Sequence, residues 1–215
     1  MTQAKPDFHL EEKHANQGLV IGVDEVGRGP WAGPVMAGAV WINPALLSSL
    51  PLEIIDSKKL TPSKREYIHK ALTSIDIAMA VGQADVEEID KLNILNATFL
   101  AMERACINLQ EKMGSNIKTI LVDGNRKPIF KVMSEQINRI PIINGDNISI
   151  SIAAASIIAK QIRDSYMCDL HSRHPEYGFN RHKGYGTKLH RLALAEFGPT
   201  PHHRSSFAPI RALKS

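Results

Sequence analysis

Hydrophobic residues recur with two different periods along the chain, and together they predict an α/β fold. Short apolar runs rich in β-branched residues predict buried strands at 19–24, 33–42, 75–81, 119–122 and 139–143. Apolar residues spaced three and four apart predict helices at 62–72, 86–111, 148–171 and 187–196, with a further one beginning near residue 206. Strands that come first and then alternate with helices are typical of a mixed sheet covered by helices.

Short motifs mark the boundaries of these elements. Gly27, Gly29 and Pro30 separate the first two strands by so short a link that the pair is expected to be antiparallel. Thr61 followed by Pro62 is typical of a helix N-cap and a first helical residue. No linker precedes the last predicted helices, so we expect them to form a small extension that packs on the main domain and borders a groove.

The charge of the chain is uneven. Residues 160–215 carry 10 Lys and Arg against 4 Asp and Glu, whereas residues 1–159 carry 16 against 18. Six of the nine histidines also lie in the basic segment. A basic region beside an acidic body suits a phosphate-rich partner such as a nucleic acid. A solvated basic surface would show the same balance.

Several classes of protein are excluded by composition. The chain contains no run of about 20 apolar residues, so no membrane span and no membrane partner are expected. Residues 1–17 are polar and lack the apolar core of a secretory signal. Cys106 and Cys168 are far apart and belong to no CxxC pair, which excludes a disulfide scaffold and a cysteine-rich zinc site. A cytoplasmic location is therefore expected.

Four acidic residues follow the ends of predicted strands. Asp24 and Glu25 end the first strand, Asp123 ends the fourth, and Asp146 comes just after the fifth. Sites in open α/β sheets form at such edges, and buried carboxylates need a compensating cation. Ligation by carboxylates alone favours Mg²⁺ or Mn²⁺. Two such ions stabilise the attacking and the leaving oxygen in phosphoryl transfer.

Each of these acids also has an ordinary structural explanation. Asp146 suits the N-cap of the following helix, and Asp123 with Gly124 suits a simple turn. Adjacent strand residues face opposite ways, so Asp24 and Glu25 do not both ligate in ideal strand geometry. Glu25 would then ligate after a rotation at Gly27 or through its backbone carbonyl.

Backbone and basic groups near the acids suggest contacts to a polyanion. Gly27, Arg28 and Gly29 follow the first acids directly, and their backbone amides can approach a phosphate or a sugar hydroxyl, although the segment could be only a turn. Lys58 and Lys59 form a small basic loop that could hold a phosphate or be mere surface.

Two segments of the basic region combine cations with rings. Lys183 and Tyr185 lie among glycines at 182–187, where an exposed tyrosine can stack on a base or a sugar. The segment at 202–207 includes Arg204 and is similarly rich in phosphate donors. Its paired histidines could instead bind a transition metal, but no soft fourth ligand accompanies them.

Taken together, these motifs resemble those of the ribonuclease HII family, the bacterial type 2 ribonucleases H. The matching segments follow the family order from residue 18 to residue 210: 23–30 (VDEVGRGP), 56–60 (DSKKL), 92–94 (LNI), 121–125 (LVDGN), 153–160 (AAASIIAK), 178–179 (GF), 182–185 (HKGY), 203–204 (HR) and 206–207 (SF). Asn144 replaces the family's usual lysine. The turn after the first acids and the absence of a longer N-terminal platform favour this family over the related type HIII enzymes.

The resemblance implies an α/β fold, an RNase H-like mixed five-stranded sheet flanked by helices. The catalytic domain would span 18–172, with a basic helical extension at 173–215 and a frayed lead at 1–17. It also implies an enzyme that cleaves the RNA strand of RNA–DNA hybrids and duplex DNA at embedded ribonucleotides, leaving 5′-phosphate and 3′-hydroxyl ends. A monomer is expected, although the sequence itself does not give the oligomeric state.

The same resemblance assigns roles to particular residues. Two Mn²⁺ or Mg²⁺ ions would be held by the four acids. The 2′-hydroxyl would be sensed by the glycine–arginine–glycine turn, and the sugar would stack on the tyrosine. These residues are Asp24, Glu25, Asp123 and Asp146 for the metal, Gly27, Arg28 and Gly29 for the turn, and Tyr185 for stacking.

Two other functions are compatible with the motifs. One is another two-metal nuclease or resolvase on the same fold, and the other is a module that binds hybrids without cutting them. Four clustered acids speak against pure binding, because they repel phosphates unless metal is bound.

Overall fold

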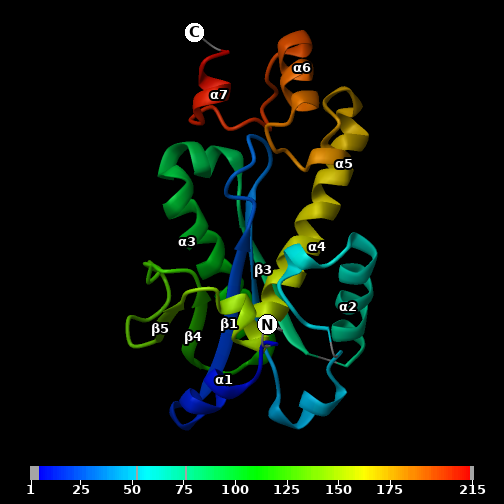
Figure 1. Cartoon of the computed structure of the whole chain (residues 1–215). Helices are drawn as coiled ribbons and strands as arrows, with labels where there is room; N and C mark the ends of the chain where they lie inside the picture. Colours follow the sequence, from blue (N-terminus) through cyan, green and yellow to red (C-terminus); the bar gives the residue numbers. More distant parts are fainter. Residues whose placement is uncertain (1–4, 52, 76, 214–215) are drawn as a thin grey trace.

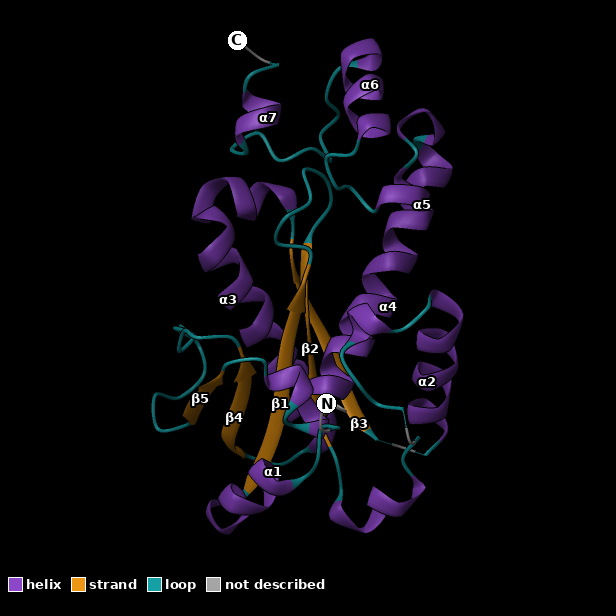
Figure 2. Ribbon diagram, in the orientation of Figure 1, coloured by secondary structure: helices purple, strands orange, loops and turns teal. Residues whose placement is uncertain are grey.

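The fold is built on one mixed sheet with the strand order β3-β2-β1-β4-β5 (Figures 1 and 2). The computed structural model describes residues 5–213 except Leu52 and Asp76. β2 is antiparallel to both β1 and β3, whereas β1, β4 and β5 are parallel to one another. The strands are β1 Leu19–Val26, β2 Val35–Trp41, β3 Ala78–Ala84, β4 Ile117–Asp123 and β5 Asn138–Ile142. The predicted fold class and the predicted hairpin of the first two strands are confirmed.

Two long helices cover opposite faces of the sheet, α3 Val86–Met113 and α4 Ile150–Arg173. Alternate residues of β1 divide between them: Ile21 and Val23 pack with α3, while Gly22 faces α4. The shorter helix α2 Pro62–Ser74 packs beside α4 (Figure 2). It begins as predicted at Thr61, whose hydroxyl accepts a hydrogen bond from the Lys64 amide.

Helix α4 lies unusually close to the sheet because small residues face each other there. A Cβ added to Gly22 would lie 2.3 Å from the Ile152 amide, and one added to Gly38 would lie 2.5 Å from the Ala155 carbonyl oxygen. The alanines at the start of α4 are fully buried in this contact. The close approach fixes the start of α4, and therefore the loop before it, against β1.

Strand β3 and helix α3 differ most from the prediction, whereas the other predicted elements have boundaries within two residues of those expected. Strand β3 lies three residues later than expected, at Ala78–Ala84. Helix α3 is kinked at Asn93, whose φ of 66° is left-handed. The Asn93 side chain accepts hydrogen bonds from the amides of Leu95 and Asn96, so it starts a new helical segment inside what the hydrophobic pattern predicts as one helix.

The N-terminal segment is ordered where the structure describes it, contrary to the expected frayed lead. Helix α1 His9–His14 packs near the start of α4, and Asp7 pairs with Ser149 through backbone hydrogen bonds to Ile148 and Ile150. The Glu11 carboxylate is buried and accepts hydrogen bonds from the side chains of Ser149 and Ser151. The part of the expected lead at 1–4 lies outside the described residues.

The C-terminal helices form a separate small core at one end of the molecule. Figure 1 shows them beside the loop that joins β1 and β2. Buried Tyr177, Phe179, Leu194 and Ile210 pack there with Ala32 of that loop. The helices are α5 Phe179–His182, α6 Lys188–Phe197 and α7 Ala208–Arg211. In the described part of the chain, no helix has the length and apolar character needed to cross a bilayer.

Candidate active site

The four acids predicted from the sequence meet at one edge of the sheet. β1, β4 and β5 are parallel neighbours, so their carboxyl ends share that edge. Asp24 lies near the end of β1, Asp123 is the last residue of β4, and Asp146 lies in the short turn Gly145–Asn147 after β5. The negative charge of Asp123 raises the pKa of Asp24, Glu25 and Asp146, so Asp123 lies close enough to repel each of the other three carboxylates.

Asp24 is the most enclosed of the four, with only 5 % of its surface exposed. Burial raises its pKa well above the ordinary value, and repulsion from Glu25 and Asp123 raises it further. Its carboxylate accepts hydrogen bonds from the Glu25 amide at 2.7 Å and from the side chain of Ser156 on α4. The charged form of Asp24 is therefore unfavourable in the metal-free protein, as expected for a cation ligand.

Glu25 points to the other face of the sheet, as strand geometry predicts. Its carboxylate accepts a hydrogen bond from Arg28 at 3.2 Å. It lines a hollow of about 80 Å³ together with Asp123 and residues of α3. Burial raises the pKa of Glu25, although Arg28 opposes that shift. Asp24 and Glu25 thus approach the sheet edge from opposite faces, and the negative charge of Asp123 raises the pKa of both.

Hydrogen bonds hold Asp123 and Asp146 in one loop arrangement. The Asp123 carboxylate accepts a bond from the Gly145 amide at 2.7 Å, and the Asp146 carboxylate accepts one from the Asn147 side chain at 2.7 Å. The N-cap of α4 is Ser149, whose hydroxyl accepts a bond from the Ile152 amide. The alternative that Asp146 is the cap of that helix is therefore wrong, and its carboxylate is left available for another role.

The chemistry of this donor set fits a hard divalent ion. The four groups are oxygen donors, three have a raised pKa because they are buried near like charges, and a cation would relieve both effects. Their oxygens are engaged with Arg28, Gly145 and Asn147. Accordingly, within residues 5–213 as described, no three acidic, histidine or cysteine side chains form a ready coordination shell.

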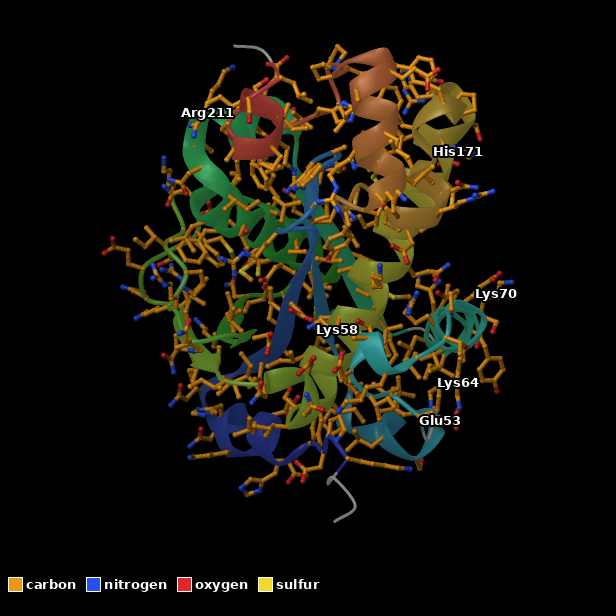
Figure 3. The ribbon with its side chains drawn as sticks, turned by 45° about the horizontal axis from the view of Figure 1, so that its top comes forward. Glu53, Lys58, Lys64, Lys70, His171 and Arg211 are labelled. Atoms are coloured by element: carbon orange, nitrogen blue, oxygen red, sulfur yellow. The ribbon has the colours of Figure 1, made fainter. Side chains whose placement is uncertain are left out.

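Two lysines of the basic loop, Lys58 and Lys59, lie beside the acids. In the view of Figure 3, Lys58 lies near the middle, whereas Lys64 and Lys70 lie on the outer side around α2. Partial burial lowers the pKa of Lys58, but Asp24, Asp56, Asp146 and Asp123 outweigh burial and raise it. The Lys59 ammonium donates to Asn147, the residue that holds Asp146. Both lysines are exposed, so their charges face the solvent where a polyanion would approach.

Two buried arginines, Arg163 and Arg204, hold the turn after β1, and the position of Arg204 contradicts the role predicted for it. Arg204 is fully buried, and its guanidinium donates to the carbonyl oxygens of Gly27, Arg28 and Gly33. The expectation that Arg204 contacts a phosphate directly is therefore wrong. Arg163, which sequence reasoning missed, is also fully buried and joins the same loop to Lys183 by donating to the carbonyl oxygens of Ala32, Pro34 and Lys183.

Tyr185 lies against this turn with 47 % of its surface exposed. A Cβ added to Gly29 would lie 3.4 Å from the Tyr185 ring, so the turn and the ring form one surface. Arg28 is exposed beside them. The Lys183 ammonium donates to Cys168 Sγ and to the Asn180 carbonyl oxygen. The structure thus brings the predicted turn, Tyr185 and Lys183 together at the end of β1.

Sequence reasoning also missed two serines beneath the acids. The hydroxyls of Ser57 and Ser156 are 2.7 Å apart and buried, and Ser156 bonds Asp24. Ser156 interrupts an otherwise apolar helical run, and that buried polar position is the signal that could have identified it.

The sheet order and its acidic edge place the chain in the RNase H-like class of endonucleases. Its structure superposes on the ribonuclease H2 of Pyrococcus horikoshii with a TM-score of 0.75 and 26 % identity, covering 91 % of this chain and 96 % of that one. The fold also matches a Bst-RNase HIII solved in complex with Mn²⁺, at a TM-score of 0.71 and 18 % identity, over 92 % of this chain and 70 % of the other. Enzymes of this class use a divalent metal.

Sequence comparison identifies the family within this class. Residues 21–210 match the family described as Ribonuclease HII. The chain is 48 % identical to the ribonuclease HII of Paramagnetospirillum magneticum over 95 % of its own length and 96 % of the relative's. It is also 48 % identical to that of Wolbachia pipientis wMel, over 97 % and 98 %. The chain therefore belongs to the ribonuclease HII family.

Proposed function

We propose that Asp24, Glu25, Asp123 and Asp146 form the catalytic centre of this ribonuclease HII and hold two Mn²⁺ or Mg²⁺ ions during catalysis. The observation that supports this most strongly is the convergence of four carboxylates, from three parallel strand ends, into one coupled and partly buried group. Divalent ions in such a site activate water and stabilise the developing charge on the phosphate and the leaving oxygen. Glu25 would contribute through its side chain or its backbone carbonyl.

The reaction is cleavage of the RNA strand of RNA–DNA hybrids and of duplex DNA at embedded ribonucleotides. In our proposal the products carry 5′-phosphate and 3′-hydroxyl ends. Lys58, Lys59 and Lys183 contact phosphates from the rim of the site, and Arg204 contributes by holding the turn. In our proposal the enzyme acts as a monomer.

The metal proposal predicts a specific loss of ion binding in the Asp123→Asn variant. Asp123 is coupled to the other three acids, so its neutral replacement should weaken Mn²⁺ binding at the whole site by about tenfold or more, a loss of about 1.4 kcal/mol. Calorimetric titration of the metal-free protein with Mn²⁺ measures this directly. The matched control is Asp169→Asn on the exposed side of α4. Equal Mn²⁺ affinity in wild type and Asp123→Asn would contradict the assignment.

We further propose that the 2′-hydroxyl of the substrate is sensed by Gly27, Arg28 and Gly29 together with Tyr185. The backbone of the turn can hydrogen-bond a 2′-hydroxyl, the group that distinguishes RNA from DNA. The half-exposed Tyr185 ring beside Gly29 can stack on the neighbouring sugar. A deoxyribose packs there better than a ribose, which favours cleavage at RNA–DNA junctions.

Tyr185→Ala should therefore reduce cleavage at a single embedded ribonucleotide more than cleavage of an all-RNA hybrid. We expect a difference of about tenfold in kcat/KM, because a stacking contact contributes about 1–3 kcal/mol. Tyr185→Phe is the control, since it keeps the ring and should retain the preference. An equal fall on both substrates, or no fall on either, would mean that Tyr185 has only a packing role.

A further inference from the structure

Three histidines of the C-terminal extension lie inside its core rather than on the surface. His182, His190 and His203 are 8 %, 0 % and 2 % exposed. The rings of His182 and His190 are stacked with centroids 4.5 Å apart, and those of His190 and His203 are 5.2 Å apart. Such enclosed rings are not phosphate donors, so another role must explain why polar groups occupy this core.

The hydrogen bonds of two of these rings fix where their protons lie. The Thr200 amide donates to His203 Nδ1 at 2.9 Å, so that nitrogen carries no proton and His203 Nε2 does. His203 Nε2 lies 3.0 Å from His190 Nε2 and must donate to it. The remaining proton of His190 is then on Nδ1, which lies 3.0 Å from the carbonyl oxygen of Tyr185. These hydrogen bonds therefore all donate in one direction, from the Thr200 amide through His203 and His190 to the carbonyl oxygen of Tyr185.

His182 supports the same segment by a parallel arrangement. The Gly184 amide donates to His182 Nδ1 at 3.2 Å, and His182 Nε2 then donates to the Tyr177 carbonyl oxygen at 2.7 Å. Burial lowers the pKa of all three rings, that of His190 to about 4 and that of His203 to about 3. Each ring is therefore neutral at physiological pH and keeps one donor and one acceptor, as the series requires.

We propose that His190 and His203 are positioning residues that set the backbone of Tyr185 and thereby hold its ring beside Gly29. The proposal rests on the sugar-stacking role proposed above for Tyr185. The Tyr185 carbonyl oxygen also accepts a bond from the Thr187 amide, and the Tyr185 amide donates to the His182 carbonyl oxygen. The donor on His190 adds a buried restraint on the Tyr185 carbonyl from the core of the extension. No group of this series touches the substrate surface, so its effect must pass through Tyr185.

The test compares His190→Leu with His190→Asn. Leucine removes the donor to Tyr185, whereas the asparagine amide can still donate from the position of Nδ1. We expect His190→Leu and His203→Leu to lower the ratio of kcat/KM on an embedded ribonucleotide to kcat/KM on an all-RNA hybrid by about fivefold to tenfold. His190→Asn should retain most of that ratio. Tyr177→Phe is the control for loss of a polar bond in the same core, because its hydroxyl donates to Gly198 instead.

Two further measurements separate this idea from its alternatives. In a Tyr185→Ala background, His190→Leu should change the substrate ratio less than twofold, since both act through one ring. Imidazole ¹⁵N spectra of the wild type should show His203 protonated on Nε2 and His190 on Nδ1, both neutral. Opposite tautomers, or a folded His190→Leu variant with unchanged Tyr185 amide resonance, would overturn the positioning role. If Tyr185→Ala itself leaves the ratio unchanged, the stacking role fails, while the spectra still decide the hydrogen-bond series.

Discussion

Replacing Asp24 by asparagine is expected to abolish cleavage while making the metal-free protein more resistant to heat. The activity should fall at least about 1000-fold, because losing a metal ligand removes several kcal/mol of transition-state stabilisation. The stability should rise because Asp24 is buried, its pKa is raised first by burial, and it is repelled by Glu25 and Asp123. Each kcal/mol shifts the Tm of a protein of this size by about 2–4 °C, so an increase of about 2 °C or more is expected.

Thermal unfolding in EDTA and cleavage assays at saturating Mn²⁺ measure the two effects separately. Glu111→Gln, an exposed acid at the far end of α3, is the matched control and should change neither. Mn²⁺ should raise the Tm of the wild type and raise that of Asp24→Asn less. Activity within tenfold of wild type, or a lower Tm in EDTA, would contradict the role assigned to Asp24.

Arg204→Met is expected to destabilise the protein by about 3–5 kcal/mol, because it leaves three enclosed or partly enclosed carbonyl groups without their cationic donor. These carbonyls belong to Gly27, Arg28 and Gly33, so the turn beside the acids should also become disordered. Cleavage should therefore fall even below the unfolding temperature. The free energy of unfolding from urea titration and the kcat/KM at 25 °C test both statements.

A comparison of basic residues controls for the loss of charge. Arg211 is exposed on α7 (Figure 3), so Arg211→Met removes the same charge without removing these bonds. It should leave stability within about 0.5 kcal/mol of wild type. Arg204→Lys should be intermediate, since one ammonium group cannot reach all the carbonyls. Arg204→Met with the stability of Arg211→Met would show that Arg204 is not a structural anchor.

The elements that depend on local pattern could be predicted from the sequence. β1, β2, β4 and β5 are apolar runs that end at turn residues, and α2 begins at a Thr-Pro pair. The acidic edge follows from the same logic, because Asp24 and Asp123 directly follow runs that must be buried in a sheet. The prediction of opposite faces for Asp24 and Glu25 rests only on strand geometry and agrees with their contacts to Ser156 and Arg28.

The features that the sequence does not predict depend on contacts between distant segments. β3 begins late because α2 continues to Ser74 and is capped by Ile75. The later part of the strand packs closely on α3, where a Cβ on Gly82 would lie 2.3 Å from the Ala101 carbonyl oxygen. The first helix is ordered by Glu11, whose partners Ser149 and Ser151 lie more than 130 residues away. Neither contact can be predicted from composition or local sequence pattern, because each joins segments that are far apart in the chain.

The net charge of residues 160–215 overstates how much positive charge this region presents on the surface. Arg163 and Arg204 contribute to its positive charge, yet both are fully buried and bond to backbone carbonyls. His182, His190 and His203 are likewise buried, and their lowered pKa values keep them neutral inside the extension. A basic segment therefore supplied structural anchors as well as surface charge, and only the fold distinguishes the two.

The most direct test of the central claim is product mapping on duplex DNA that contains one ribonucleotide. With Mn²⁺, the proposed site predicts a single cut at the ribonucleotide that leaves 3′-hydroxyl and 5′-phosphate ends, and that disappears in EDTA and in Asp24→Asn. A 2′,3′-cyclic phosphate end would mean that the substrate hydroxyl attacks without the acidic centre. That product, or cleavage that persists in EDTA, would contradict the account.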